Sequence, residues 1–363
     1  MNLNDNLKKQ YTEDRMSAIE AQRLAQIYTF GPVMFQVARL MVKWGVFEML
    51  NDAPATPEEV ADKLGISVYA AKCLLEASLT MRTVTVDTET GKYALAKAGW
   101  FLVNDESTRV NMDFNHDVNY QGLFYLEEAL KEGRPAGLKC LGDWPTVYEG
   151  LSSLPPQVQK SWFAFDHFYS DGSFEQALEL VFSRPTRTLM DVGGNTGRWA
   201  MQCVHHNPEV EVTIVDLPQQ LGMMREQTAG QHGADRIRGY AANMLDDNSK
   251  LPSDRQWDAI WMSQFLDCFG EEEIVSILRR AAEVMTPDTH LYTMETHWDR
   301  QRFDTAALCL TQISLYFTAI ANGNSKMYHS DDLVRLVEKA GLHVETIHDF
   351  LGLGHSVLEC TIQ

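Results

Sequence analysis

The sequence predicts an α/β fold in which helices cover both faces of a mostly parallel sheet, preceded by a helical N-terminal region. Two observations support this. From residue 187 onward, β-like runs alternate with helix-like runs, as they do in proteins built on parallel sheets. In addition, a glycine-rich turn follows the first of these runs, between a strand-like and a helix-like segment. We expect two domains, residues 1–105 and residues 106–363, with 106–180 as a helical connecting region.

Composition restricts the partners of the chain. The 363 residues carry a formal charge of −19, which disfavours nucleic acids and anionic membranes because phosphate binding needs a basic surface. The chain has no run of eighteen apolar residues, and its N-terminus lacks the apolar core of a signal peptide, so we expect a cytoplasmic protein with no membrane contact. The six cysteines lack metal-ligand spacing, which predicts free thiols and no metal site.

Residues 12–105 have a mainly helical pattern. Thr56 is a candidate N-cap followed by Pro57, and Gly65 marks the end of that helix. A second helix over 68–81 and two β-rich runs within 83–95 complete a winged-helix pattern. The second helix offers only one cation, Lys72, among apolar residues, so we expect it to pack rather than to read DNA.

The segment 31–50 is apolar on most of its faces. Such a segment must be buried, either in the core of its own domain or against a partner chain. Both readings stay open, and the second predicts a homodimer with an interface above about 2,000 Å².

The connecting region 106–180 is dense in aromatic residues. Aromatic side chains beside a cofactor domain can form the wall of a pocket for a flat apolar ligand, although plain packing between domains explains them equally well. The candidate pocket residues are His116, Tyr120, Phe163 and His167.

Seven strands are expected in the C-terminal region, at 189–192, 212–215, 237–240, 259–262, 291–295, 344–347 and 357–362. Helices are expected between them, for example over 198–206, 271–283 and 330–340. Ligands of such sheets bind beyond the carboxyl ends of the strands. The polar residues expected there are Asp191, Asp216, Asn243, Ser263, Asp267 and Glu295.

The strongest motif is the glycine turn Asp-Val-Gly-Gly-Asn-Thr-Gly over 191–197. Gly193 and Gly194 let the backbone approach a ligand and place helix N–H groups beneath it. Asp216 ends the next strand, nineteen residues after Gly197, where a carboxylate can accept hydrogen bonds from both ribose hydroxyls. This pairing predicts a nucleoside site.

The glycine turn, the Val-Asp-Leu-Pro sequence at 215–218 and the N-terminal winged-helix pattern together resemble the small-molecule O-methyltransferases that carry a dimerisation domain. The resemblance spans roughly residues 25–363. It implies a class I S-adenosylmethionine-binding domain, Rossmann-like, with an antiparallel seventh strand, behind a helical winged-helix dimerisation domain. It also implies a small aromatic or polyketide-like substrate and a homodimer.

The same resemblance implies the cofactor-binding residues. Asp191, Gly193 and Gly194 would lie against the cofactor, and Asp216 with Leu217 would hold the ribose. Asn243 and Met244 match the pair that meets the adenine, and Ser263 falls near the position that holds the methionine end.

The residues favour S-adenosylmethionine over a dinucleotide. No basic residue near Asp216 suits a 2′-phosphate, and the strand-end acids suit a sulfonium cation. A nicotinamide-dinucleotide site is the alternative within this fold.

One departure from the family concerns catalysis. The family carries Leu-His-Asp-Trp after the fourth strand, with the His as general base, whereas this chain has Leu-Asp-Cys-Phe at 266–269. Gap-free alignment puts Asp267 at the His position, whereas a slip of one residue would put Leu266 there and Asp267 at the family Asp; the His is absent in both alignments. Of the two acids that orient the family His, Glu295 matches the first and Asp332 is the nearest match to the second.

Replacing His by Asp makes removal of a phenolic proton harder by roughly 3.5 kcal/mol, because the ordinary pKa of Asp is near 3.9 and that of His near 6.5. Burial beside Glu295 could raise the pKa of Asp267. The alternatives are an acidic substrate, another base (His297, His167 or His116), or proximity alone.

Three functions follow from these observations. The first is methyl transfer to a hydroxyl of a small aromatic or polyketide-like metabolite. The second is an S-adenosylmethionine-binding homologue with chemistry other than methyl transfer, which the missing His favours. The third is a non-catalytic winged-helix regulator, against which the intact glycine turn and the acidic charge argue.

Overall fold

The computed structural model describes residues 1–362, and the chain forms two compact units. The smaller unit comprises residues 14–117, and the larger comprises residues 1–13 together with 118–362. The expected boundary at 105/106 is therefore shifted. Helix α7 (Glu106–Phe114) packs on α6 (Lys97–Asn104), and α6 in turn packs on the earlier helices of the smaller unit.

The smaller unit contains the two helices and the hairpin that the sequence indicates. The side chain of Thr56 accepts a hydrogen bond from the backbone of Glu59, and Gly65 ends the helix with a φ of 66°. The elements of the smaller unit, besides α6 and α7, are α2 (Ala18–Lys43), α3 (Val46–Asp52), α4 (Pro57–Leu64), α5 (Val68–Thr80), β1 (Val84–Val86) and β2 (Tyr93–Leu95). The π-helical turn η1 (Asn115–Asn119) includes residues of both units.

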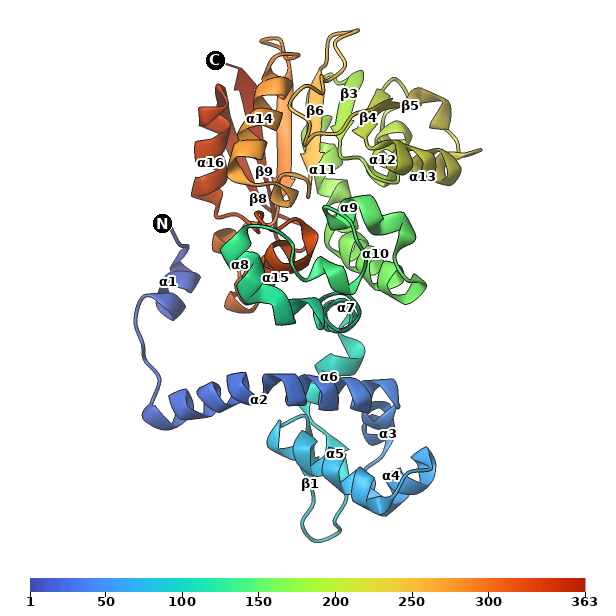
Figure 1. The fold of residues 1–363 in the computed structure, drawn as a ribbon, viewed down its shortest axis with the longest axis vertical. Helices are drawn as coiled ribbons and strands as arrows, with labels where there is room; N and C mark the ends of the chain where they lie inside the picture. The colour runs from blue at the N-terminus through green and yellow to red at the C-terminus, as the bar shows by residue number, and fades with distance from the viewer. Residues whose placement is uncertain (363) are drawn as a thin grey trace. The chain divides into compact units, whose positions relative to one another are not determined.

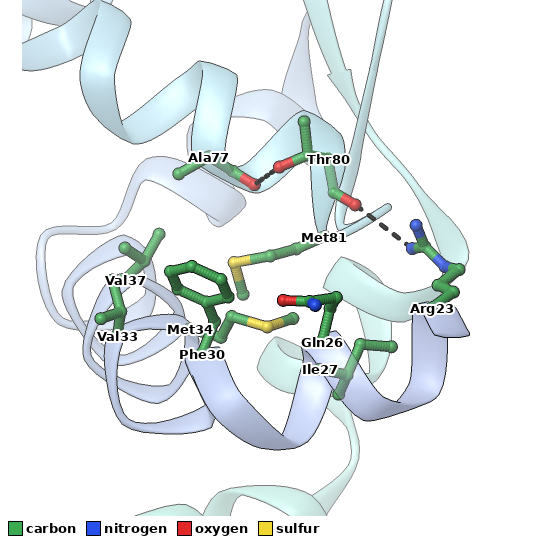
Figure 2. Close-up of a pocket in the computed structure, with 10 residues that line it drawn as sticks. All are labelled: Arg23, Gln26, Ile27, Phe30, Val33, Met34, Val37, Ala77, Thr80 and Met81. Atoms are coloured by element: carbon green, nitrogen blue, oxygen red, sulfur yellow. Dashed lines mark hydrogen bonds between the residues drawn. The ribbon is translucent and has the colours of Figure 1, made fainter. Parts of the chain in front are cut away.

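Helix α2 has one packed face and one open face. Ala38 and Met41 are buried, whereas Tyr28, Phe30 and Val33 are 70%, 58% and 60% exposed. The open face, together with the end of α5, lines a hollow of about 290 Å³ (Figure 2). Much of the apolar 31–50 segment therefore packs into the core of the smaller unit, whereas the middle of α2 stays exposed within this unit.

The larger unit begins with a short helix and resumes with irregular helical turns. These elements are α1 (Asp5–Tyr11), η2 (Gly122–Tyr125), α8 (Leu126–Glu132), η3 (Leu138–Cys140), α9 (Val147–Gly150), η4 (Leu151–Ser153), α10 (Pro156–Asp171) and α11 (Phe174–Val181). The helical elements that follow are α12 (Arg198–His206), α13 (Pro218–Thr228), η5 (Ala234–Arg236), η6 (Leu266–Cys268), α14 (Glu271–Ala282), η7 (Trp298–Arg300), α15 (Asp304–Tyr316), η8 (Phe317–Ala321) and α16 (Ser330–Lys339).

The sheet of the larger unit has seven strands in the order β5-β4-β3-β6-β7-β9-β8 (Figure 1). The strands are β3 (Thr188–Val192), β4 (Glu211–Asp216), β5 (Ile237–Ala241), β6 (Ala259–Ser263), β7 (His290–Glu295), β8 (Leu342–Leu351) and β9 (His355–Ile362). Neighbours pair in parallel except at β9, which runs antiparallel to both β7 and β8. The mostly parallel sheet with an antiparallel last strand is confirmed.

Alternate strand residues enter two separate cores, one on each face of the sheet. Met190 and Val192 pack with α14 and α16, whereas Leu189 packs with α11, α12 and α13. Because both faces are covered, the central strands β3, β4, β6 and β7 are largely apolar, whereas the edge strand β8 carries polar residues along its length.

The N-terminal segment belongs to the larger unit because it is anchored there. Leu7 is completely buried, α1 packs on α15, and the side-chain amide of Asn4 donates to the backbone carbonyl of Gln301 at 2.7 Å. Asn2 also hydrogen-bonds the carboxylate of Asp331. Sequence reasoning missed this docking, since α1 is short and has a single buried apolar residue.

One helical stretch, Asp304–Ala321, is long and apolar enough to cross a membrane by length and composition alone. Within it, 44% of the residues are buried in the protein, among them Leu310, Ile313 and Tyr316.

Candidate active site

The glycine turn after β3 is held against the end of β4. The backbone N–H of Gly193 donates to the carbonyl of Val215 at 2.9 Å. Gly193 has a φ of 81°, and a Cβ atom there would collide with the ring of Phe265. A Cβ at Gly194 would lie 2.5 Å from a carboxylate oxygen of Asp191. Both glycines are therefore required by the close approach of neighbouring side chains, and their contact with a cofactor stays a prediction.

Asp216, the last residue of β4, lies next to this glycine turn. Its two oxygens accept hydrogen bonds from the backbone N–H groups of Leu217 at 2.7 Å and Asn195 at 2.8 Å. Burial raises the pKa of Asp216, while these two bonds oppose the rise. The carboxylate is thus oriented by the backbone, and its remaining lone pairs are available to a ligand.

Four buried side-chain oxygens near the carboxyl ends of the strands have no hydrogen-bond partner, and they belong to Asp191, Asn195, Gln264 and Glu295. Native proteins pair nearly all buried polar atoms, so a group of unpaired acceptors points to a ligand that donates to them. Asn195 and Gln264 also have left-handed backbones, with φ of 50° and 45°. Such strain in residues other than glycine concentrates at functional sites.

Asp191 and Ser263 end neighbouring parallel strands. Burial, reinforced by the charge of Asp216, raises the pKa of Asp191 to about 8. Ser263 is the last residue of β6 and is half-buried, next to the strained Gln264. The two residues lie at the same edge of the sheet, as the sequence predicts.

The expected adenine-binding pair lies in the loop after β5. Met244 is buried and Asn243 is exposed, with the Asn243 side chain accepting from the backbone of Leu245 at 3.0 Å. Arg280 of α14 donates to the carbonyl of Met244 at 2.7 Å and to those of Asp246 and Ser249 at 3.0 Å. The sequence analysis missed Arg280. A lone Arg on the apolar face of a helix is the signal that could have revealed it.

Asp267 and Glu295 are brought together as expected. One oxygen of Glu295 accepts from the backbone N–H groups of Phe265 at 3.1 Å and Leu266 at 2.8 Å, which fixes the turn that carries Asp267. Burial raises the pKa of Asp267 to about 7. Burial and the charge of Asp267 raise the pKa of Glu295 well above its ordinary value. Asp267 thus has a pKa close to that of a His, and its place at the family His position stays a prediction.

Several residues around Asp267 were not anticipated. Cys268 Sγ lies 3.4 Å from a carboxylate oxygen of Asp267, and the Tyr148 hydroxyl is buried without a partner. The charge of Asp267 contributes to raising the pKa values of Tyr148 and Tyr316, after burial itself. Asp166 completes this group, because the charge of Asp267 also raises its pKa. Tyr148, Asp166 and Tyr316 come from α9, α10 and α15. Local sequence patterns do not predict that these helices approach η6.

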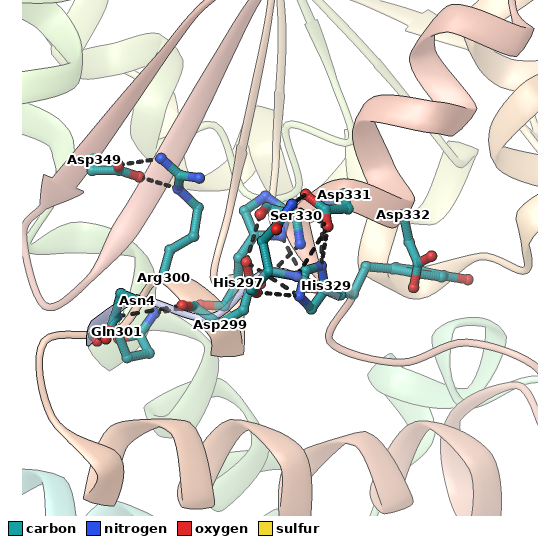
Figure 3. Close-up of polar contacts among 12 residues, drawn as sticks. Asn4, His297, Asp299, Arg300, Gln301, His329, Ser330, Asp331, Asp332 and Asp349 are labelled. Atoms are coloured by element: carbon teal, nitrogen blue, oxygen red, sulfur yellow. Dashed lines mark hydrogen bonds and ion pairs between the residues drawn. The ribbon is translucent and has the colours of Figure 1, made fainter. Parts of the chain in front are cut away.

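His297 and Asp332 are held in other interactions (Figure 3). His297 is completely buried, and its Nδ1 lies 3.0 Å from the carbonyl of Tyr328. Asp332 lies on α16 and forms ion pairs with Lys326 at 3.7 Å and Arg335 at 3.5 Å. Neither has a hydrogen bond or ion pair with Asp267 or Glu295, so the structure offers no support for the expected role of Asp332.

The four expected pocket residues separate into two sets. His116 belongs to the smaller unit, where its Nδ1 lies 2.7 Å from the carboxylate of Asp117. Tyr120, Phe163 and His167 belong to the larger unit and are half-buried. Phe163 and His167 stack with ring centroids 5.9 Å apart on α10, the helix that also carries Asp166.

All six cysteines are free thiols. Within residues 1–362, no group of three or more His, Cys, Asp or Glu side chains is arranged to hold a metal ion.

Comparison with protein families finds two matches along the chain. The Dimerisation2-like domain matches residues 22–93, and the O-methyltransferase domain matches residues 170–343. The first lies in the smaller unit and the second covers β3 to the start of β8.

Individual relatives are distant but span most of the chain. The L-tyrosine C(3)-methyltransferase of Streptomyces lavendulae is 24% identical over 340 residues, covering 92% of this chain and 90% of the relative. The apo structure of the S-adenosylmethionine-dependent methyltransferase SibL matches with a TM-score of 0.68 and 24% identity, over 93% of this chain and 98% of that one.

A third relative carries ligands. The O-methyltransferase NcsB1 from neocarzinostatin biosynthesis, solved with S-adenosylmethionine and 2-hydroxy-5-methyl naphthoic acid, matches with a TM-score of 0.66 and 20% identity. The match covers 91% of this chain and 96% of that one. At these identities the structural matches establish the fold.

Proposed function

Because this chain belongs to the S-adenosylmethionine-dependent methyltransferases that join a dimerisation domain to an O-methyltransferase domain, we propose that it methylates a hydroxyl of a small aromatic or polyketide-like metabolite. The observation that supports this proposal is the buried carboxyl of Asp267, which gap-free alignment puts at the family His position and whose pKa burial raises to about 7.

The residues at the carboxyl edge of the sheet fit the cofactor. S-adenosylmethionine, when bound, supplies an electrophilic methyl group on a sulfonium centre. The unpaired oxygens of Asp191, Asn195 and Gln264 suit its ammonium group and hydroxyls, since all three are acceptors. Asp216 would hold the ribose, and Met244 would meet the face of the adenine.

Asp267 would take the proton of the acceptor hydroxyl. An unperturbed Asp would be a poor base for a phenol, but a pKa of about 7 offsets the whole of the roughly 3.5 kcal/mol that the missing His costs. Glu295 positions the turn that carries Asp267 through the backbone of Phe265 and Leu266. In this proposal Glu295 is a positioning residue and Asp267 is the base.

The test is transfer of a labelled methyl group from S-adenosylmethionine to a panel of phenols, catechols and hydroxynaphthoates. We expect at least one methyl ether among the products. Saturable binding of S-adenosylhomocysteine without transfer to any acceptor of the panel would contradict the proposed reaction.

Methylation of an aromatic carbon beside a phenolic hydroxyl is the second candidate. It is favoured by the relative that aligns over 92% of this chain, which is named for methylation at a ring carbon. In that reaction the ring carbon of a phenolate forms the new bond and then loses its hydrogen as a proton, which a base such as Asp267 would accept. NMR of the product distinguishes a methyl ether from a ring methyl group.

We also propose a homodimer formed through the smaller unit. The match to a Dimerisation2-like domain and the exposed Tyr28, Phe30 and Val33 support it. A second copy of the chain would cover the hollow between α2 and α5. We expect the interface to exceed about 2,000 Å² and to be mainly apolar.

The net charge of the protein restricts the kinds of partner that we expect besides a second copy of the chain. With a net charge of −19, the protein is expected to act on a small molecule in the cytoplasm rather than on nucleic acid or at an anionic membrane.

A further inference from the structure

The turn η6, which carries Asp267, is held by hydrogen bonds on both sides of that residue. Before Asp267, one oxygen of Glu295 accepts from two backbone N–H groups at 3.1 and 2.8 Å. After it, the side-chain amide of Asn322 donates to the backbone carbonyl of Cys268 at 2.6 Å. The function proposed above gives Glu295 a positioning role but leaves the bond from Asn322 without one.

A buried serine orients the amide of Asn322. The hydroxyl of Ser325 donates to Oδ1 of Asn322 at 2.7 Å, and Ser325 is only 2% exposed. The backbone N–H of Asn324 also donates to that oxygen, at 3.4 Å. Because the amide oxygen accepts and the amide nitrogen donates, these bonds leave the nitrogen facing the carbonyl of Cys268. The side chain is therefore set as a donor to the turn.

The backbone at Asn322 is fixed by its neighbours. Asn322 follows the π-helical turn η8, and the N–H groups of Asn322 and Gly323 both donate to the carbonyl of Phe317, at 3.1 and 3.0 Å. Turns of this kind are rare and occur frequently at functional sites. Gly323 has a φ of 94°, and a Cβ atom there would lie 2.4 Å from the backbone of Arg134. Asn322 is thus anchored on its own side of the bond to η6.

A second side chain from the same loop reaches the next residue of the turn. The hydroxyl of Tyr328, which is 5% exposed, donates to the carbonyl of Phe269 at 2.7 Å. The carbonyls of Cys268 and Phe269, the two that follow Asp267, are therefore both held from the segment 322–328. A reacting side chain has to stay within about 0.5 Å of its productive position, and supporting hydrogen bonds of this kind keep it there.

We propose that Asn322 is a positioning residue for Asp267, because its bond to the carbonyl of Cys268 keeps the Asp267 carboxylate where it can take the proton of the acceptor. The proposal rests on the function proposed above and concerns the same site. Ser325 acts one step further away, by orienting the Asn322 amide. The loop after α15 and the turn after β6 then act together on one side chain.

The first measurement is kcat at saturating substrates for the parent protein, Asn322→Ala, Asp267→Asn and the double variant. We expect Asn322→Ala to lower kcat about tenfold to a hundredfold, since displacing a catalytic group by about 1 Å can cost a hundredfold. In the Asp267→Asn background the same substitution should have little effect, because no base remains to be positioned. Damage unrelated to the base would cost the same factor in both backgrounds.

The matched control is Asn324→Ala in the same loop. Asn324 is exposed, and its side-chain amide lies 3.4 Å from Glu273 instead of contacting η6, so kcat should stay near the parent value. Ser325→Ala keeps Asn322 and removes only the bond that orients its amide. This variant should lower kcat in the same direction by a smaller factor, and it replaces Asn322→Ala if that protein does not fold.

The second measurement needs no methyl transfer. In protein labelled with carbon-13 at the Asp carboxyl groups, the signal of Asp267 is the titrating signal that is missing from Asp267→Asn. Burial raises the pKa of Asp267, and a turn released by Asn322→Ala admits water. The midpoint of Asp267 should therefore fall by about half a pH unit or more in Asn322→Ala and stay unchanged in Asn324→Ala.

Three results would overturn the proposal: equal losses of kcat in the two backgrounds, an unchanged Asp267 midpoint in Asn322→Ala, or a raised KM for the acceptor with kcat unaffected. The last result would place Asn322 against the acceptor itself. If the protein methylates no acceptor, the proposed reaction fails while the titration still decides the role of Asn322: a lowered midpoint supports it and an unchanged one overturns it.

Discussion

The carboxylate of Asp216 accepts a hydrogen bond from the backbone N–H of Asn195 at 2.8 Å, so the end of β4 is tied directly to the glycine turn after β3. The sequence presents these as two motifs about twenty residues apart. In the structure they are one unit, since the carboxylate expected to bind the ribose also holds the strained residue of the turn.

Replacing Asp216 by Ala should weaken binding of S-adenosylhomocysteine by roughly 2–4 kcal/mol, because charge-assisted bonds to the ribose and the bond to Asn195 are lost together. Calorimetry measures the affinity, and Asp235→Ala, an exposed acid nearby, serves as control. Equal affinities in the parent protein and in both variants would show that Asp216 does not contribute to cofactor binding.

Asp267→Asn should lower the rate of methyl transfer about a hundredfold to ten-thousandfold, the usual loss when a general base is removed. The Asn side chain keeps the shape of Asp but cannot accept a proton. Affinity for S-adenosylhomocysteine should stay within a few-fold of the parent value, because Asp267 is assigned to the acceptor side.

The pH dependence of the parent enzyme follows from the same residue. Only the ionised carboxylate is a base, so the rate should rise with pH through about 7, the pKa of Asp267. This limb should be missing from the residual activity of Asp267→Asn. A profile that is unchanged by Asp267→Asn but lost in His297→Gln would instead identify His297 as the base.

Asp191 should make the cofactor-free protein less stable as pH rises. Its pKa is about 8 when folded and 3.8 ordinarily, so between these values the folded state holds a proton that the unfolded state has released. In this window the free energy of unfolding falls with pH by about 1.4 kcal/mol per pH unit for this one group.

Urea unfolding of Asp191→Asn and of the parent protein at pH 5, 6 and 7 measures this contribution. Since other buried acids act equally on both proteins, the two slopes should differ by about 1.4 kcal/mol per pH unit, with the parent protein losing more stability. Parallel slopes would show that Asp191 is already ionised in the folded protein.

Arg280→Leu should loosen the loop 243–249, because three backbone carbonyls lose their donor. We expect a roughly tenfold weaker affinity for S-adenosylhomocysteine and a loss of about 1–3 kcal/mol in the free energy of unfolding. Arg279→Leu, an exposed neighbour on the same helix, should change neither quantity appreciably. If both variants lowered affinity and stability to a similar extent, the cause would be a change in α14 and not the loss of the bonds to the loop 243–249.

Charges on the open face of α2 should separate the proposed dimer. Sedimentation at micromolar concentration is expected to show a dimer for the parent protein and a monomer for Phe30→Asp/Val33→Asp, since two charges would have to be buried against a second copy. Tyr69→Asp, at the other end of α5 from the hollow, should stay dimeric. A monomeric parent protein would contradict the proposal outright.

Residues with a local role were predictable from the sequence. The seven strands, the glycine turn and Asp216 each follow from periodicity or from a motif a few residues long. The proximity of Asp267 and Glu295 was also predictable, because Glu295 ends β7 and Asp267 lies in the turn after the neighbouring strand β6.

Residues whose role depends on the approach of distant helices were not predictable. Asp166 is one acid in an aromatic helix until α10 approaches Asp267, and Tyr148 is an ordinary Tyr until its hydroxyl is buried there. His297 was a reasonable candidate for the base because it lies two residues beyond the end of β7. The chain turns after Thr296, however, and places the His297 ring beside Tyr328. Asp332 is the nearest sequence match to the second acid of the family, and its ion pairs with Lys326 and Arg335 account for its position without a role in the site.

The burial of Leu7 has a consequence for the order in which the protein is made. A ribosome synthesises residues 1–13 first, yet their docking partners are Gln301 and Asp331, which emerge some three hundred residues later. The smaller unit, by contrast, is continuous in sequence and can fold as soon as residue 117 is out. The first helix must therefore wait undocked through most of translation.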